Sequence, residues 1–390
     1  MPDTNQSPLA VTDDAFKASR LERMLSNFTA SYKIYFLKAV FDAAVSGEPC
    51  VAYDRLAASM VASAWYPVLF FRLNLGATDQ LARVVDTAHA RLALDRSASR
   101  GDVVAAILST NDQTVSRQLR DLCKYVPYRL LRVFYEDRFA EEKAATGPIR
   151  DGRVNGLISK FNREDPAGAP YVLEYDGSGI VVDPGWARYF RDNQHVIQGW
   201  LDMRLVDYLQ RRNPSVPAIP LKIHPPLQRN LTEARRWWKD AIERRPLRDV
   251  YTGTLLGQDS FRDYGPLSID HFIPWSFVLH DEPWNLLPTF RNTNSSKGDR
   301  LPDLERCLPD FCIQQFEALI TLRDKHEHHK IVDAYALVDP HTREYERTEC
   351  SLSKFSETIS RVIAPLHQIA ANQGFPMWAE QPQSRSGLDL

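Results

Sequence analysis

The chain has 390 residues, of which 44% are hydrophobic and 25% are charged, and its formal net charge is −2. This length predicts two or three domains with a sizeable core. The near-neutral charge excludes a general polyanion-binding surface, so any nucleic-acid contact has to come from local patches.

Five scattered cysteines without a C-x-x-C pair indicate a reducing compartment. The start of the chain lacks an apolar signal core, and no run is apolar enough to span a bilayer. We therefore expect a cytoplasmic protein with no membrane partner.

The first third of the chain is predicted to be helical. Apolar and aromatic residues recur at helical spacing from Leu21 to Phe36, and Gly47 ends this long helix. Charged and small residues over 141–156 predict an exposed loop or linker. The runs on either side of "DGSG" predict a hairpin within 171–183, and a single helix is expected over 184–213.

These elements predict an α+β fold, mainly helical, with a small hairpin in the middle and a ββα finger towards the C-terminus. The proline-rich stretch over 215–228 has too many prolines for regular structure and is expected to connect two domains. The predicted division is a helical N-terminal domain over 1–145, a hairpin-helix region with a linker over 146–225, the finger over 226–305, and a helical C-terminal region over 306–390.

The chemistry is concentrated in "SIDHFIPWSFVLHDEPWNLLPTFRNTNSSKGDRLP", residues 268–302. A short strand ends in Asp270 and His271, and Pro274 terminates it. A second strand, "NLLPTF", starts at Asn285. A short polar helix then carries Asn294 and Lys297.

This pattern resembles the HNH endonuclease family, whose ββα-metal finger holds one divalent cation. It also resembles the HNH domain of RNA-guided CRISPR nucleases, an HNN variant with Asn at the third position. The resemblance implies catalytic roles for His271, Asn285 and Lys297, and metal ligation by Asp270 and Asn294. It implies that His271 is the general base, that Asn285 pins the loop and orients His271, and that Lys297 contacts a phosphate.

The residue types suit phosphodiester hydrolysis. A neutral imidazole can take a proton from water, and carboxylate and amide oxygens suit Mg²⁺, with Mn²⁺ as an alternative ion. Because Asp270 and His271 are consecutive, a regular strand would turn them to opposite faces, so we expect a bend before Pro274. No cysteine lies within residues 229–306. We therefore expect no structural zinc, and expect aromatic side chains such as Phe277 and Phe290 to hold the finger.

A basic helix precedes the finger. Residues 235–249 carry six basic and three acidic side chains, and two adjacent tryptophans. The run is either a solvated helix face with a buried tryptophan or a basic approach to nucleic acid. Under the second interpretation, the nucleic-acid-binding residues are Arg235, Arg236, Lys239, Arg244, Arg245, Arg291 and Arg300.

Other histidines are less informative. His280 lies between the two strands and is interpreted as a solvated loop residue rather than a ligand. "HEHH", residues 326–329, resembles a metal cluster, but without a fourth ligand nearby in sequence a charged helix end is the better interpretation.

Together these features predict a metal-dependent HNH endonuclease acting on DNA. Resemblance to stand-alone HNH proteins implies a bacterial defence effector of anti-phage or restriction type, with a partner subunit of a defence complex as a further expectation. Two alternatives stay open: a nucleic-acid-binding or scaffold subunit of a larger complex with a non-cutting finger, and an RNA-cleaving HNH nuclease.

Overall fold

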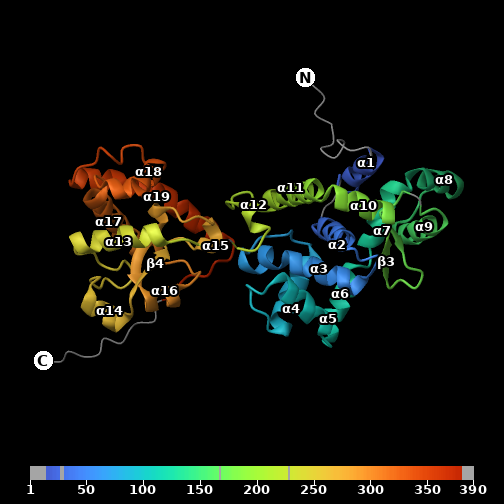
Figure 1. Ribbon diagram of the computed structural model, residues 1–390, viewed down its shortest axis with the longest axis horizontal. Helices are drawn as coiled ribbons and strands as arrows, with labels where there is room; N and C mark the ends of the chain where they lie inside the picture. Colours follow the sequence, from blue (N-terminus) through green and yellow to red (C-terminus); the bar gives the residue numbers. More distant parts are fainter. Residues whose placement is uncertain (1–14, 27–29, 167, 227–228, 380–390) are drawn as a thin grey trace, which may run out of the picture. The chain divides into compact units, whose positions relative to one another are not determined.

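The computed structural model describes residues 15–26, 30–166, 168–226 and 229–379. The chain divides into two compact units (Figure 1). Unit 1 runs to Pro214 and includes Ile219–Pro225, and unit 2 consists of Ser215–Ala218 and the residues from Pro226 onward. Helices dominate both units and the sheets are small, so the predicted mainly helical α+β fold is confirmed. The finer division into four domains stays a prediction.

Unit 1 consists of helices and one small sheet. Its helices are α1 (Ala15–Met24), α2 (Tyr32–Ser46), α3 (Tyr53–Trp65), the π-helix η1 (Tyr66–Phe70), α4 (Gln80–Leu92), α5 (Arg100–Ser109), α6 (Gln113–Leu122), α7 (Val126–Leu131), the 3-10 helix η2 (Arg132–Phe134), α8 (Glu136–Thr146), α9 (Asp151–Glu164), α10 (Pro184–Asp192), α11 (Gln194–Arg212) and α12 (Ile219–Lys222).

The long helix predicted near the start of the chain is two helices, because α1 ends at Met24 and α2 begins at Tyr32. The backbone N–H of Ser31 donates to a carboxylate oxygen of Asp79 at 2.6 Å, and this distant contact helps to fix the new helix start. Gly47 ends α2 as predicted, since its φ of 82° is in the left-handed region that favours glycine. Residues 27–29 of the predicted helix lie outside the described residues.

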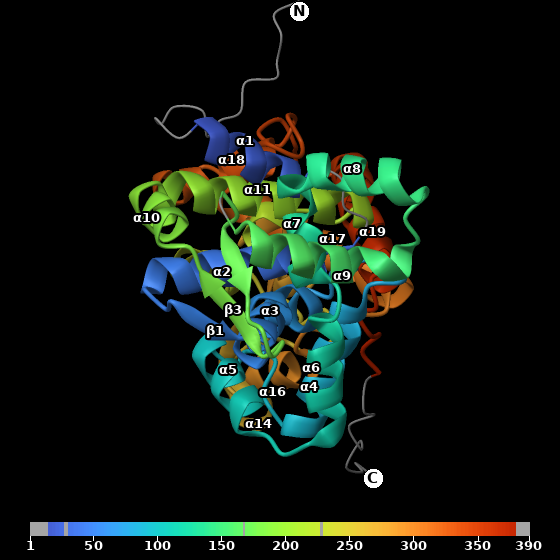
Figure 2. The ribbon, with the colours of Figure 1, turned by 90° about the vertical axis from the view of Figure 1, so that its right-hand side faces the viewer.

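The predicted hairpin is present as β2 (Tyr171–Leu173) and β3 (Gly179–Val182), which pair antiparallel. A third strand that was not predicted, β1 (Cys50–Ala52), pairs with the other side of β3 (Figure 2). Gly179 faces Ala52 in this register, and a Cβ at Gly179 would lie 2.4 Å from the carbonyl oxygen of Val51. Glycine is therefore required where these strands approach.

The loop predicted over 141–156 is wrong. Helix α8 continues to Thr146 and α9 begins at Asp151, so only the four residues between them are irregular. Glu, Lys and Ala are good helix formers, and that propensity outweighs the high charge that favoured a loop. The single helix predicted over 184–213 is likewise interrupted, because Asn193 separates α10 from α11.

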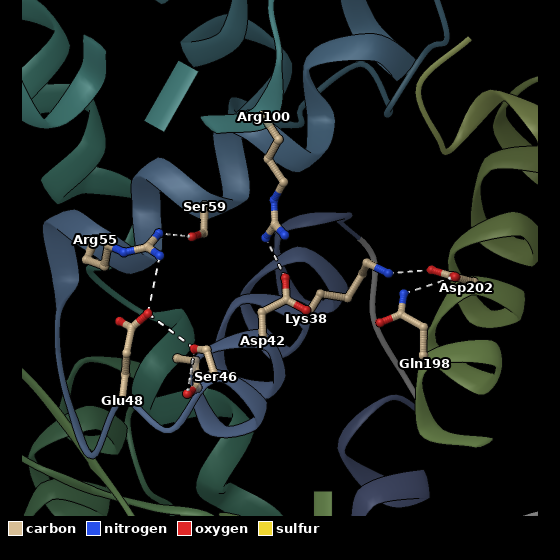
Figure 3. A network of polar contacts seen from close by, with 10 residues as sticks. Lys38, Asp42, Ser46, Glu48, Arg55, Ser59, Arg100, Gln198 and Asp202 are labelled. Atoms are coloured by element: carbon tan, nitrogen blue, oxygen red, sulfur yellow. Dashed lines mark hydrogen bonds and ion pairs between the residues drawn. The ribbon is translucent and has the colours of Figure 1, made fainter. Parts of the chain in front are cut away.

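Polar contacts cross-link four helices of unit 1 (Figure 3). Lys38 of α2 forms an ion pair with Asp202 of α11, and Asp42 of α2 pairs with Arg100 at the start of α5. Arg55 of α3 donates to Ser59 at 2.7 Å and lies 3.3 Å from Glu48. These pairs tie α2 to its neighbours.

Unit 2 contains the predicted finger and the C-terminal helices. Its elements are α13 (Thr232–Arg244), α14 (Gln258–Tyr264), β4 (Leu267–His271), α15 (Trp275–Val278), the 3-10 helix η3 (Pro283–Asn285), β5 (Leu286–Phe290), α16 (Arg291–Lys297), α17 (Leu304–Leu322), the 3-10 helix η4 (His326–His328), α18 (His329–Ala336) and α19 (Glu349–Asn372). None of the described helices of the chain is both long enough and apolar enough to cross a bilayer.

Aromatic side chains from outside the finger pack against it. Phe290 at the end of β5 contacts Tyr264 of α14, with ring centroids 5.0 Å apart. Phe277 of α15 contacts Phe375, which follows α19, at 5.7 Å. Both Phe277 and Phe290 are fully buried, so they have the packing role predicted for them.

Candidate active site

Two antiparallel strands and the helix that follows them form the ββα finger. β4 and β5 pair in register from Leu267 opposite Phe290 to His271 opposite Leu286, and α16 begins directly after β5. The pairing continues unbroken through His271, and the chain then bends at Phe272 and Ile273, before Pro274, where the bend was expected. Asp270 and His271 both lie within the paired strand, and their side chains find partners on different segments of unit 2.

Asp270 is buried, and two groups hold its Oδ2 atom. The hydroxyl of Tyr251 donates to Oδ2 at 2.6 Å, and Nζ of Lys297 lies 3.0 Å from the same oxygen. The ring of Tyr251 packs edge-on against Trp378 near the end of the described chain, with centroids 5.3 Å apart. The backbone N–H of Trp378 donates to Leu301 at 2.7 Å. A C-terminal segment thus helps to position the tyrosine that holds Asp270.

The structure corrects the role predicted for Lys297. Its side chain is 0% exposed, and Nζ donates to the carbonyl oxygen of His271 at 2.8 Å while it pairs with Asp270. Because α16 packs on β4, the last residue of the helix points into the finger rather than outward. A buried ammonium group that already binds two oxygens of β4 is not placed to contact a phosphate. Lys297 instead joins α16 to the strand that carries Asp270 and His271.

The side chain of His271 is only 4% exposed, and its Nε2 lies 2.9 Å from Oδ1 of Asp281. The hydrogen bond from His271 is the largest cause that lowers the pKa of the Asp281 carboxyl, and the charge of Arg229 lowers it further. An ionised carboxylate can only accept a hydrogen bond, so Nε2 carries the hydrogen, and in the neutral ring the lone pair is then on Nδ1. This tautomer leaves Nδ1 able to accept a proton.

Asn285 pins the loop between the strands. Its Oδ1 accepts from the backbone N–H of Ile273 at 2.8 Å, and its Nδ2 donates to the carbonyl of the same residue at 2.9 Å. Its own carbonyl accepts from the backbone N–H of Phe272 at 2.8 Å. The side chain is fully buried. These bonds fix the two residues that follow His271, so Asn285 acts on the histidine through the backbone.

We expect Asn285→Ala to destabilise unit 2 by about 2–6 kcal/mol, because two buried backbone groups of Ile273 would lose their partners at about 1–3 kcal/mol each. Thermal and urea unfolding of the full chain measure this change. The exposed Asn292 of α16 supplies the matched control, since Asn292→Ala should stay within about 0.5 kcal/mol of the wild type. Equal effects for the two variants would show that Asn285 does not hold the loop.

Asn294 of α16 lies beside the strand that carries Asp270. Its Nδ2 donates to the hydroxyl of Ser268 at 2.8 Å and to the carbonyl of Ile269 at 3.1 Å. Both partners accept hydrogen bonds, which fixes the amide orientation and directs Oδ1 away from them. Asn294 therefore presents its oxygen, rather than its nitrogen, to any further partner.

The family model described as HNH endonuclease matches residues 249–303, which contain the Tyr251 turn, both strands and α16. Residues 249–303 form an HNH endonuclease domain. No curated protein and no solved structure matches the chain. The assignment therefore concerns this domain, and the remainder of the chain is described by its own structure.

The basic residues predicted to bind nucleic acid have different surroundings. Arg235 donates to the carbonyl of Leu267 at the start of β4 at 2.9 Å, and Arg245 pairs with Glu317 of α17 at 2.7 Å. Lys239 lies 3.8 Å from Glu243 on the same helix. Both tryptophans of α13 are buried. The exposed residues without a carboxylate within ion-pair distance in the described part of the chain are Arg236, Arg244, Arg291 and Arg300.

The other histidines are less solvated than predicted. His280 packs on Trp284 with ring centroids 5.0 Å apart, and burial is the main cause that lowers its pKa to about 4. His328 is buried against Trp237, and its Nε2 lies 2.8 Å from Asp240. In the part of the chain that the structure describes, no three His, Cys, Asp or Glu side chains gather in a group that could hold a metal ion. Within the "HEHH" stretch His328 contributes to packing, whereas His326, Glu327 and His329 are exposed, as a charged helix end would be.

Sequence reasoning missed Tyr251 and Asp281. Tyr251 precedes the motif by nineteen residues, as its bond to Asp270 shows, and Asp281 lies in the loop between the strands. Neither residue is part of a periodic pattern that marks a strand or a helix. For Asp281, the sequence offered only its acidic side chain in a short loop that follows His271 closely.

Proposed function

We propose that the chain is a metal-dependent endonuclease that hydrolyses DNA phosphodiester bonds at its HNH domain. The observation that carries the proposal is the His271–Asp281 hydrogen bond inside a domain of this family, directly next to the carboxylate of Asp270. Asp270 and His271 are the last two residues of β4, and in this proposal one phosphodiester at the end of the strand contacts both side chains.

His271 acts as the general base in this mechanism. Its Nδ1 takes a proton from the attacking water, and the carboxylate of Asp281 stabilises the imidazolium that forms. A low exposure keeps the ring in one orientation and strengthens the bond to Asp281. Asn285 maintains the backbone that follows the histidine.

The donor set fits a hard divalent cation such as Mg²⁺, or Mn²⁺ in its place. Oδ2 of Asp270 is held by Tyr251 and Lys297, which leaves Oδ1, and the bonded amide of Asn294 leaves its own oxygen. One carboxylate and one amide oxygen leave room for water and phosphate ligands, which Mg²⁺ retains. A cation bound there supplies charge neutralisation at the phosphate and stabilises the departing 3′ oxygen.

DNA has to be held partly from outside the finger. Between Val250 and Pro302 there are four basic and six acidic side chains, so the domain alone attracts a polyanion poorly. We assign backbone contacts to the exposed cations at its edges, which are Arg236, Arg244, Arg291 and Arg300. Arg235, Lys239 and Arg245 are weaker candidates for contacts to the DNA backbone, because each already forms an ion pair or a hydrogen bond within the protein.

Incubation of the purified chain with supercoiled plasmid, linear DNA and RNA, with and without Mg²⁺ or Mn²⁺, tests the proposal. Metal-dependent conversion of plasmid to nicked or linear forms supports it. Cleavage of RNA alone would favour the RNA-cleaving alternative. If neither DNA nor RNA is cleaved with metal present, the chain is better explained as a binding or scaffold subunit.

A chain that joins a larger helical unit to a small nuclease domain also suits a controlled enzyme, so we include a bacterial defence role and a regulatory partner subunit in the proposal.

Asp281 gives a prediction that the sequence alone did not offer. We expect Asp281→Asn to lower kcat by at least roughly tenfold to a hundredfold, the range seen when a carboxylate that orients a metal-bound imidazole is removed, with KM little changed. Steady-state cleavage of a labelled duplex measures both constants. Asp281→Glu should recover part of the loss, because it restores a carboxylate.

Asp259→Asn provides the matched control, since it removes the same charge from a side chain of the HNH domain that is 99% exposed. If Asp281→Asn cleaved faster than the wild type, Asp281 would be a group that blocks the histidine. If it cleaved at the rate of Asp259→Asn, the hydrogen bond would have no part in turnover.

A further inference from the structure

The segment from Gln113 to Arg132 in unit 1 carries a local excess of positive charge. It contains five basic residues and one acidic residue, Asp121, a balance of +4 in a chain whose net charge is −2. It covers α6, the turn after it, α7 and the first residue of η2. The five basic residues are Arg117, Arg120, Lys124, Arg129 and Arg132.

Most of these cations are exposed and available. Arg117, Arg120, Lys124 and Arg132 face solvent, and among the described residues none of the four has a carboxylate within ion-pair distance. Arg129 differs, because its two terminal nitrogens bind the carboxylate of Asp151 at 2.8 and 3.0 Å. Positive charge in this segment is therefore only partly neutralised by the fold.

The excess of positive charge also acts on Lys33 of α2. Burial lowers the pKa of Lys33, and the positive charges of Arg129 and Arg132 lower it further. Cations from α2, α7 and η2 thus gather closely enough to repel one another. Such repulsion costs stability in the unbound protein, and a bound anion would relieve it.

An exposed aromatic ring lies within this group. Tyr125 is 48% exposed, with Nζ of Lys124 5.4 Å and Cζ of Arg129 5.9 Å from the centre of its ring. Two cations that flank an exposed ring combine phosphate attraction with a flat surface on which a base can stack. An exposed tyrosine of this kind does not contribute to the core of unit 1.

Two polar hollows are lined by residues of α6 and of the turns on either side of it, and one of them includes Tyr125. The first, of about 530 Å³, is lined by Asn111, Gln113, Thr114, Arg117 and Arg120 among others. The second, of about 510 Å³, is lined by Tyr32, Thr78, Gln80, Asp121, Lys124 and Tyr125 among others. Arg120 and Asp121 are consecutive residues of α6, and the first hollow includes Arg120 while the second includes Asp121.

We propose that this α6–α7 surface, built around Arg117, Arg120, Lys124 and Tyr125, binds a nucleic-acid strand that has unpaired bases. The cations contact the phosphates and the ring of Tyr125 stacks on a base. The inference rests on the proposed nuclease function and extends it, because it gives unit 1 the task of holding part of the substrate or a strand that controls the enzyme. An unpaired strand suits the surface better than a duplex, since stacked base pairs hide the faces that Tyr125 would contact.

The first test removes three charges. We expect Arg117→Gln/Arg120→Gln/Lys124→Gln to weaken binding of a single-stranded oligonucleotide of about 20 nucleotides. Its salt dependence, log K against log salt, should flatten by about 2 units, because each lost phosphate contact on a single strand removes about 0.7. Fluorescence anisotropy of the full chain in EDTA measures binding without cleavage.

The matched control is Arg83→Gln/Arg96→Gln/Arg188→Gln, which removes the same charge from exposed positions elsewhere in unit 1. The two triple variants keep the same net charge, so a general electrostatic effect would move both. An unaltered slope in the first variant, or equal slopes in the two, would overturn the proposal.

The second test removes the ring. Tyr125→Ala should weaken single-strand binding by about fivefold to a hundredfold or more, which is the range for the loss of one base-stacking contact. Tyr125→Phe should bind as the wild type does, because stacking needs no hydroxyl. Weakening of duplex binding with no effect on the single strand would overturn the assignment to unpaired bases, and binding only of an acidic protein segment would replace the nucleic acid by another partner.

These results are separable from the proposed function. A wild-type chain that cleaves DNA while the triple variant binds single strands normally rejects the α6–α7 surface and leaves the nuclease intact. A chain that binds single strands through this surface but cleaves nothing rejects the proposed function alone.

Discussion

The His271→Ala variant should lose phosphodiester cleavage by roughly 10²–10⁴-fold, which is the contribution of a well-placed general base. The structure supports this expectation because the imidazole has one defined partner, the carboxylate of Asp281 at 2.9 Å, and a free lone pair on Nδ1. Cleavage of supercoiled plasmid in Mg²⁺, followed over time, measures the loss.

The same substitution should leave the chain folded, although not unchanged. The ring is buried, so its removal leaves space and takes a partner from Asp281. That carboxylate is 27% exposed, so water can replace the lost bond, and the cost should stay near 1–3 kcal/mol. His280→Ala is the matched control, since it removes a half-buried imidazole without a proposed role from the loop between β4 and β5. A folded His271→Ala chain that cleaves at the rate of His280→Ala would reject the assignment of the base.

The order of the elements that carry the candidate residues could be predicted from the sequence, but the contacts of their side chains could not. The spacing of Asp270, His271, Asn285 and Asn294 specified strand, loop, strand and helix, and the structure has that order. Whether Lys297 points outward or inward depends on how α16 packs on β4. A seven-residue helix with polar side chains on several faces does not reveal that orientation, and so the phosphate contact was a wrong prediction.

Long-range partners set a second limit. Tyr251 is held by Trp378, and Phe277 by Phe375, across distances of about a hundred residues in the chain. The periodicity of a local stretch of sequence cannot reveal a contact between residues so far apart. For the same reason β1 was missed, because a three-residue strand has no readable alternation and exists through its pairing with β3. The hairpin of β2 and β3 was predictable, since its turn residues lie between its own strands.

The buried pair of Asp270 and Lys297 should produce the largest stability changes. Asp270→Asn keeps the shape of the side chain but leaves a fully buried ammonium group without its carboxylate. Breaking one side of a buried ion pair costs about 3–5 kcal/mol. Lys297→Met should cost a similar amount, because it leaves the carboxylate of Asp270 with only the hydroxyl of Tyr251. Urea unfolding of each variant in EDTA measures these costs.

The double variant Asp270→Asn/Lys297→Met removes both charges. It should be more stable than the sum of the single variants implies, with a coupling of about 0.5–3 kcal/mol, which is the usual range for residues in contact. Additive costs would show that the two groups do not interact in solution. Cleavage is a poor guide here, because all three variants are expected to be impaired.

Mg²⁺ then separates the structural role of Asp270 from its metal-binding role. In Lys297→Met the carboxylate has lost its ammonium partner, so a divalent cation bound to it compensates more charge than in the wild type, and the rise in Tm on adding Mg²⁺ should be larger. Asp270→Asn has lost the only carboxylate assigned to the cation, so its Tm should respond little. Ca²⁺ and high NaCl serve as controls for an oxygen-binding ion and for ionic strength. If Asp270→Asn gains as much Tm from Mg²⁺ as the wild type, Asp270 serves only to neutralise Lys297, and the cation must bind to other oxygens of the HNH domain.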